Sequence, residues 1–201
     1  MTRRLSEVRP LDFTIVRDEI KLKSVPYAFM LPEGQGYIRI SDFTETTETE
    51  LGESLDQLCD QGAKGLVLDL RDNPGGLLDQ AVSVSNTFLE KGSLIVSTRG
   101  RTPGSDQDYF ANQRASHADL PIVVLVNRGS ASASEIVAGA VQDHDRGLVL
   151  GETTFGKGLV QSIYRISGGN GLALTTAKYF TPSGRSIQRD YSGSVDDYYY
   201  A

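Results

Sequence analysis

Short runs of apolar, mostly β-branched residues alternate along this chain with segments in which apolar residues recur at helical spacing. The runs predict buried strands, and the helical spacing predicts amphipathic helices. The expected strands cover residues 12–17, 37–40, 65–70, 93–97, 122–126, 148–150 and 172–179. The expected helices cover residues 46–61, 77–89 and 132–144. Such alternation predicts an α/β domain.

The order of these elements favours one sheet-rich core of ββα units over a strictly doubly wound sheet. Strands 65–70, 93–97 and 122–126 are linked by one helical and one non-helical connection, and no G-x-G-x-x-G loop is present. Residues 99–120 are polar and contain glycine and proline, so we expect a long connection that is functional or partly mobile.

The helix at residues 46–61 carries Leu51, Leu55 and Leu58 on one face and is expected to end at Gly62. Cys59 lies beside this leucine stripe and is expected to be a small buried hydrophobe. It is the single cysteine of the chain, which excludes an internal disulfide.

Composition and charge narrow the possible functions. The chain has 201 residues, enough for one well-buried domain, and a net charge of −6, which argues against a nucleic-acid surface. Its longest apolar runs are about five residues, far short of the roughly 20 that span a bilayer. Residues 1–4 lead into polar sequence, so no signal peptide is predicted. With two histidines and no acidic or cysteine grouping at ligand spacing, neither a metal site nor a cofactor is expected.

Candidate chemistry begins where strand 122–126 turns into a helix that starts with serines. A hydroxyl on such a rigid corner lies close to the free N–H groups and the positive dipole end of the helix, which suit a nucleophile. Ser132 and Glu135 also form an S-x-x-E capping box, so this stretch alone favours an ordinary helix start over a catalytic serine. The G-x-S-x-G and S-x-x-K patterns of known serine enzymes are absent around Ser132.

A nucleophilic serine needs a base. His144 would lie about 18 Å from Ser132 along the helix axis, too far to take its proton. His117 lies in the polar connection and has no fixed neighbour. Lys157 remains, between two glycines that could fold it inward against Phe155, where desolvation favours the neutral amine that a base requires. An exposed turn lysine is the alternative.

Five motifs, in this order along the chain, resemble the C-terminal processing (tail-specific) peptidases. They are Gly36–Ile40, Leu68–Gly76, Gly129–Ile136, Gly151–Gly158 and Tyr179–Gly184, within about residues 26–188. The resemblance implies a ClpP/crotonase-like ββα superhelical core and a serine endopeptidase that acts through an acyl-enzyme. It implies Ser132 as nucleophile, Lys157 as base, Gln161 as the residue that orients the base, and the N–H groups of Gly76 and Ala133 as oxyanion donors.

The resemblance also implies polypeptide substrates with exposed C-termini and a location outside the cytoplasm. Members of the family usually carry a PDZ domain before the core. Residues 1–25 are expected to match the last strand of that domain and its connector, and residues 26–201 the catalytic core, so the chain is expected to be a truncated core. Two alternatives stay open: a peptide-binding core that is inactive without the PDZ domain, and an acyl-CoA enzyme of the crotonase type on the same fold.

Nothing in its local sequence fixes the loop that carries Lys157. We therefore expect a resting form, with Lys157 Nζ beyond hydrogen-bond reach of Ser132 Oγ until an outside domain supports the loop. Gln161 can orient the lysine only if the chain turns at residues 157–161, because four residues of strand span about 13 Å.

Overall fold

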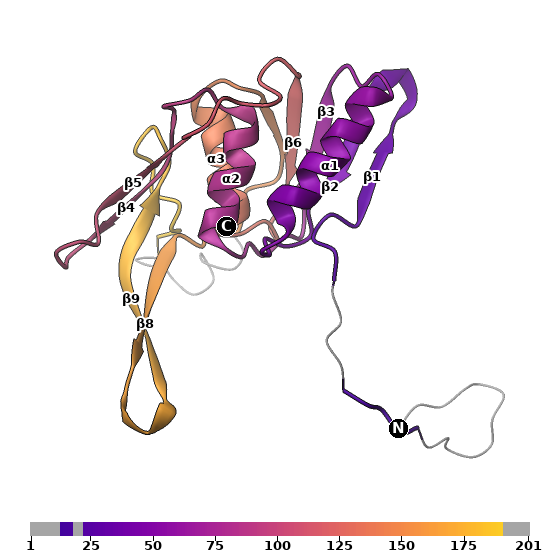
Figure 1. The fold of residues 1–201 in the computed structure, drawn as a ribbon. Coiled ribbons are helices and arrows are strands. Elements are labelled where there is room, and N and C mark those ends of the chain that lie inside the picture. Colours follow the sequence, from indigo (N-terminus) through magenta and orange to yellow (C-terminus); the bar gives the residue numbers. More distant parts are fainter. Residues whose placement is uncertain (1–12, 18–21, 191–201) are drawn as a thin grey trace.

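The computed structural model describes residues 13–17 and 22–190, which form two sheets and three helices (Figure 1). Five strands make the first sheet in the order β1-β2-β3-β6-β7. They are β1 (Tyr27–Met30), β2 (Gly36–Arg39), β3 (Leu66–Asp69), β6 (Ile122–Val126) and β7 (Leu148–Gly151). β1 is antiparallel to β2 and the other pairs are parallel, so the carboxyl ends of β2, β3, β6 and β7 meet at one edge.

The second sheet is antiparallel, in the order β5-β4-β9-β8. Its strands are β4 (Leu94–Gly100), β5 (Gln107–Phe110), β8 (Leu159–Arg165) and β9 (Gly171–Phe180). The β8–β9 hairpin projects from the body of the molecule as an arm (Figure 1). Short 3₁₀ turns lie at Pro32–Gly34 and, at the tip of the arm, at Ser167–Gly169.

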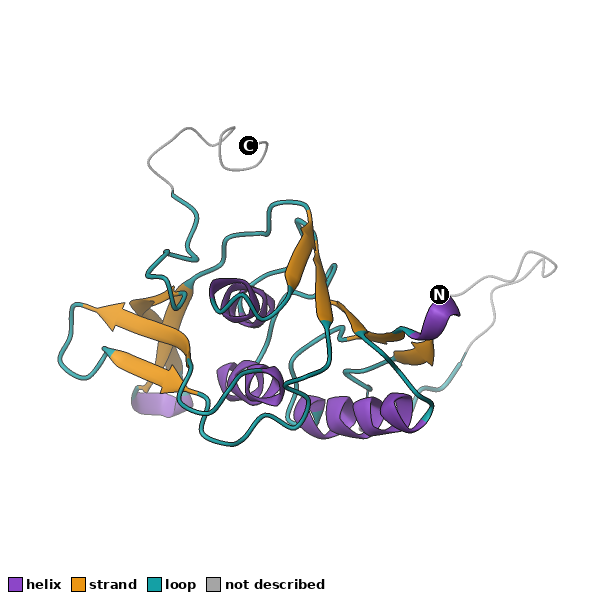
Figure 2. Cartoon of the chain, turned by 90° about the horizontal axis from the view of Figure 1, so that it is seen from above, coloured by secondary structure: helices purple, strands orange, loops and turns teal. Residues whose placement is uncertain are grey.

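Three helices pack on these sheets: α1 (Thr47–Asp60), α2 (Leu78–Phe88) and α3 (Ala133–Asp143). Helices α2 and α3 lie between the two sheets in both views (Figures 1 and 2). One continuous core joins them, with side chains such as Leu55, Leu68, Val84, Val124 and Val137 fully buried. Removing this apolar surface from water is the main stabilising term of the fold.

The α/β class, the three helices and six of the seven expected strands are confirmed, with bounds within a few residues. Helix α1 ends as expected, with Gly62 at a φ of 86°. The strand expected at residues 12–17 is wrong for residues 13–17, which have no regular structure and expose Ile15 and Val16; residue 12 lies outside the described part. A strand needs a partner, and none pairs with this segment among the described residues.

Three strands were not expected: β1, β5 and β8. β5 lies inside the polar 99–120 connection, and the strands form two sheets. Cys59 is exposed and not buried, because it lies one position past the stripe that Leu51, Leu55 and Leu58 turn toward the core.

Much of the segment expected to match a PDZ domain, residues 1–12 and 18–21, lies outside the described residues. No described helix is long and apolar enough to cross a bilayer.

Candidate active site

Ser132 lies at the turn between β6 and α3, with a φ of 54° and a ψ of −111°. A side-chain-bearing residue in such a conformation costs about 1–3 kcal/mol, which the surrounding structure must supply. Ser130, fully buried, contributes to this support: its Oγ donates to Leu70 O (2.7 Å) and accepts from Asn127 N (3.0 Å). A strained serine on a strand-to-helix turn is the arrangement that presents a nucleophile to a substrate.

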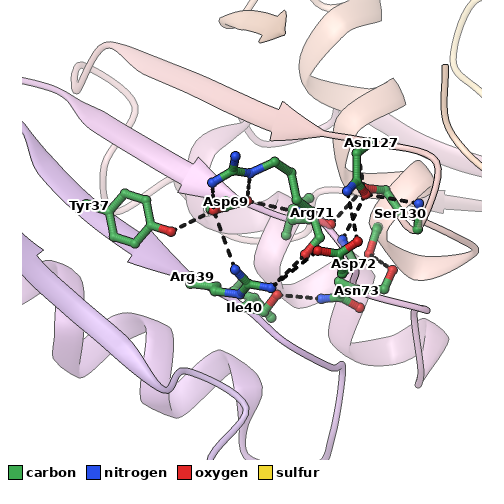
Figure 3. A network of polar contacts seen from close by, with 12 residues as sticks. Tyr37, Arg39, Ile40, Asp69, Arg71, Asp72, Asn73, Asn127 and Ser130 are labelled. Atoms are coloured by element: carbon green, nitrogen blue, oxygen red, sulfur yellow. Dashed lines mark hydrogen bonds and ion pairs between the residues drawn. The ribbon is translucent and has the colours of Figure 1, made fainter. Parts of the chain in front are cut away.

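A buried carboxylate stiffens the edge of the sheet from which this turn emerges (Figure 3). Asp69, at the end of β3, is fully buried and accepts hydrogen bonds from Tyr37 Oη (2.6 Å) and from Arg71 Nε (2.9 Å) and Nη2 (2.6 Å). Burial by itself would raise the pKa of Asp69, but the hydrogen bonds from Arg71 and Tyr37 outweigh it and lower the pKa below its ordinary value. The carboxylate therefore stays ionised and bound.

Two side chains connect the loop after β3 to the loop after β6 (Figure 3). Asn127 Nδ2 donates to Asp72 Oδ1 (2.8 Å), and Asn127 Oδ1 accepts from the backbone N–H groups of Asp72 (2.9 Å) and Gly129 (3.0 Å). The loops that precede Gly76 and Ser132 are thus held in one fixed relation.

Asn73 extends this connection to the expected oxyanion donors. Its side chain, fully buried, donates to Ile40 O (2.9 Å) and accepts from Gly75 N (2.9 Å). Its backbone carbonyl accepts from Ala131 N (3.0 Å) and from Ser134 Oγ (3.1 Å). One residue therefore bonds to both the glycine loop and the serine turn.

The glycine loop lies directly against Ser132. Gly75 has a φ of 98°, and a Cβ on it would lie 2.7 Å from both Ala131 O and Ser132 Cβ. Among the described residues, no acceptor takes a hydrogen bond from the backbone N–H of Gly76 or of Ala133. The structure thus brings both expected donors beside Ser132, with N–H groups that no described residue accepts.

Glu135 joins the serine turn to the lysine loop. Its side chain, in the first turn of α3, is buried and accepts four hydrogen bonds. Oε2 accepts from the backbone N–H of Ser132 (2.7 Å) and of Lys157 (2.9 Å). Oε1 accepts from Gly156 N and from Thr154 Oγ1, both at 2.7 Å. Because the amides of Ser132 and Lys157 share one oxygen, the backbones of the expected nucleophile and the expected base are neighbours.

The lysine loop is also held from its other side, by the segment at residues 187–189. Arg189 N donates to Gly156 O (3.0 Å), and Gly158 N donates to Gln188 Oε1 (3.0 Å). A Cβ on Gly156 would lie 2.6 Å from Arg189 Cβ, and a Cβ on Gly158 would collide with the backbone of Gln188. The two glycines therefore admit this segment; the expectation that they turn Lys157 inward against Phe155 is wrong.

Lys157 itself is exposed, and Phe155 is 43% exposed. Lys157 Nζ makes no hydrogen bond or ion pair with any described residue, Ser132 included, as the resting form requires. The reason given for that form is wrong, because Glu135 and the segment at residues 187–189 fix the loop without an outside domain. What remains free is the lysine side chain.

Gln161 is not placed beside Lys157 by a turn. β8 begins at Leu159, so the turn expected at residues 157–161 is wrong, and the exposed Gln161 side chain makes no hydrogen bond to a described residue.

His144 is the C-cap of α3, as expected, and its Nε2 lies 2.6 Å from Leu94 O. Within the described residues, no three His, Cys, Asp or Glu side chains form a group that could hold a metal.

Sequence reasoning missed the two residues that assemble the site. The sequence pattern assigns Glu135 only to a capping box, which the structure contains. What the pattern could not show is that the same carboxylate reaches residues 154–157. The sequence pattern includes Asn73 only as one residue of a motif. Its place directly before Pro-Gly-Gly is the feature that could have indicated its role at the site.

The motif at Tyr179–Gly184 and the residue after it contact the end of α3. Asp143, at the last turn of α3, accepts from Ser183 N (2.9 Å) and pairs with Arg185. Burial by itself would raise the pKa of Asp143, but hydrogen bonds from Thr181, Ser183 and Arg185 outweigh it and lower the pKa to about 2.

We expect this pair to contribute stability above the ordinary pKa of 3.8 and to lose it as the pH falls toward 2. At neutral pH, Asp143→Asn should lower the free energy of unfolding by up to about 2 kcal/mol, and the difference from the unmodified chain should shrink below about pH 4. Urea unfolding across this pH range, with the exposed Asp60→Asn as control, measures it. A gap that stays constant with pH would contradict the assignment.

The sequence of this chain is similar to those of known proteins. The family model described as Peptidase family S41 matches residues 34–199. A carboxy-terminal-processing protease of Bartonella bacilliformis is 51% identical over 185 residues, which are 90% of this chain and 42% of the relative. The carboxy-terminal processing protease CtpA of Bacillus subtilis is 40% identical over 179 residues, 89% of this chain and 38% of the relative.

The fold is similar as well. The structure of a photosystem II D1 C-terminal processing protease aligns with a TM-score of 0.74 and 36% identity, over 86% of this chain and 47% of that one. The chain thus spans about two fifths of the length of these curated relatives.

Proposed function

This chain belongs to peptidase family S41, and on that premise we propose that it is the catalytic core of a serine endopeptidase that cleaves proteins near their C-termini. Residues 26–201 would form this core, and residues 1–25 would connect it to a preceding PDZ domain. The observation that carries the proposal is the shared carboxylate of Glu135, which holds the backbones of Ser132 and Lys157 side by side.

The proposed reaction uses Ser132 and Lys157 as a dyad. Neutral Lys157 takes the proton of Ser132 Oγ as this oxygen attacks the scissile carbonyl carbon. The negative oxygen that forms accepts hydrogen bonds from the N–H groups of Gly76 and Ala133, which have no acceptor among the described residues. The C–N bond then breaks, the amine leaves with the proton from Lys157, and water hydrolyses the acyl-enzyme with Lys157 again as base.

Rotation of the Lys157 side chain would be enough to bring Nζ to Ser132 Oγ. The two backbones already lie beside each other, and the loop is fixed on both sides. Exposed side chains change rotamer in picoseconds to nanoseconds, so the motion itself is fast. The role of Gln161 as the residue that orients the lysine stays a proposal that would require β8 to rearrange.

A second candidate is a peptide-binding core that remains inactive until a PDZ domain docks. The absence of a hydrogen bond between Lys157 Nζ and Ser132 Oγ favours it. The acyl-CoA alternative loses its support, because the matched family and the relatives are peptidases. In either form we propose polypeptide partners with exposed C-termini and a location outside the cytoplasm, both on the ground of family membership.

A fluorophosphonate, which phosphonylates activated serines with loss of fluoride, tests the proposal. We expect one equivalent to attach to Ser132, with no labelling in Ser132→Ala and much slower labelling in Lys157→Ala. His144→Ala is the control and should label like the unmodified chain. Intact-mass measurement reads the result. Labelling of the unmodified chain at a residue other than Ser132 would overturn the dyad, and no labelling would favour the inactive peptide-binding core.

A further inference from the structure

We propose that the free edge of β8 is the substrate-binding strand: an extended segment of the polypeptide substrate pairs with it and is led from there to Ser132. This inference rests on the proposed peptidase function and adds to it the place where the substrate binds. It starts from the position of β8, which is the last strand of the second sheet and pairs with β9 alone among the described strands.

The backbone direction of β8 can be derived from its two ends. Gly158 O accepts from Tyr179 N (2.8 Å), and Ile166 N donates to Asn170 O (3.0 Å), so these residues point toward the β9 side. Along an antiparallel strand, alternate residues point to the partner and away from it. The N–H and C=O groups that point to the free side therefore belong to Leu159, Gln161, Ile163 and Arg165.

These four residues form what we term the β8 edge. No backbone hydrogen bond joins them to any described segment other than β9. The irregular register of the hairpin leaves this alternation intact, because between Val160 and Gln161 the extra residue lies in β9. The edge therefore presents backbone N–H and C=O groups that have no partner among the described residues. Such groups bind an extended peptide by strand addition.

The β8 edge lacks the protection that natural edge strands usually have. Exposed edges are normally kept short or interrupted by charge or proline. The other three edge strands, β1, β5 and β7, have four residues each, whereas β8 has seven, contains no proline and carries a charge only at Arg165. Apolar side chains are exposed along the same arm, with Ile163 at 77%. We therefore expect a bound polypeptide to cover this surface when the protein is active.

The β8 edge also begins at the site. Lys157 precedes the strand by two residues, and its amide shares Glu135 Oε2 with that of Ser132. A peptide paired with Leu159 and Gln161 therefore has its chain next to the nucleophile. None of the other three free edges begins within two residues of a proposed catalytic side chain.

Amide hydrogen exchange of the whole chain, followed by NMR, tests this inference without requiring turnover. The probe is a synthetic peptide of alternating valine and threonine with a free α-carboxylate, added to the Ser132→Ala variant so that it is not cleaved. We expect exchange of the amides of Leu159, Gln161, Ile163 and Arg165 to slow about tenfold or more. The amides of Ser162 and Tyr164 already bond to β9 and should not change.

A pair of variants checks the backbone origin of the binding. Ile163→Pro removes one outward N–H and leaves the bonds to β9, so the peptide should bind about tenfold more weakly. Ile163→Val keeps the N–H and should bind within about twofold of the unmodified chain. Retained protection of Ser162 and Tyr164 shows that the hairpin still forms.

Three results would overturn the inference: slowed exchange at β1, β5 or β7 in place of β8, no slowing at any soluble peptide concentration, or protection of β8 that rises with chain concentration without peptide. The last would identify a second copy of the chain as the occupant. These outcomes differ from failure of the proposed function, which the labelling of Ser132 decides by itself.

Discussion

Replacing Ser132 by alanine should lower hydrolysis of a protein substrate by about 10⁴-fold or more, and Lys157→Ala should do nearly the same, because the nucleophile and its base act as one unit. The double variant should be no worse than either single one. The Lys157 side chain makes no hydrogen bond to a described residue, and the Ser132 side chain takes part only in the capping box of α3, so the melting temperature should change little.

His144→Ala is the control for this prediction, because it removes a titratable group at the far end of α3. Rates are measured by mass spectrometry of the products over time. Substantial hydrolysis by Lys157→Ala, or loss of hydrolysis in a folded His144→Ala, would contradict the Ser/Lys assignment.

Replacing Glu135 should cost both stability and rate. Glu135→Ala leaves the amides of Ser132, Gly156 and Lys157 without their acceptor, in a place that is buried at Gly156 and partly buried at the other two. An unsatisfied buried group costs about 1–3 kcal/mol. We expect the free energy of unfolding to fall by about 3 kcal/mol, since water can replace part of what is lost. Glu135→Gln keeps the shape but offers a single acceptor oxygen.

The isosteric variant separates positioning from folding. Glu135→Gln should lower kcat by about 100-fold, because small misplacements of reacting groups are costly, and leave KM within about threefold. Glu152→Gln, an exposed residue near the same loop, is the matched control and should behave like the unmodified chain. Full activity in a folded Glu135→Gln would show that the carboxylate only caps the helix.

The sequence predicted what depends on local pattern. Local pattern was enough to assign the leucine stripe of α1, the buried runs of β3 and β6 and the serine turn between β6 and α3. Helical spacing of apolar residues marks the buried face of a helix, and a continuous apolar run marks a buried strand. β5 and β8 could not, since they are held mainly by backbone pairing with distant strands and carry mixed, exposed side chains. Elimination of the histidines left Lys157 as a candidate base, whereas Gln161 and the oxyanion roles of Gly76 and Ala133 were supplied by the resemblance to a family.

The site shows the same limit. Glu135 lies three residues from Ser132, and this relation is visible in the sequence, but its bonds to Thr154, Gly156 and Lys157 span about twenty residues and follow only from the fold. The opposite error occurred at Lys157, where flanking glycines suggested a loose loop. Glycine is also the residue that lets two backbones touch, and here it is used for that.

The contact between the lysine loop and residues 187–189 has a consequence for the order in which the molecule is made. A ribosome releases the chain from its N-terminus, so β6, the serine turn and α3 emerge well before residue 187. Until then the loop around Lys157 lacks the backbone of residues 187–189, which packs against Gly156 and Gly158. The turn that carries Ser132, the proposed nucleophile, is therefore made before the backbone around Lys157, the proposed base, can be held by residues 187–189.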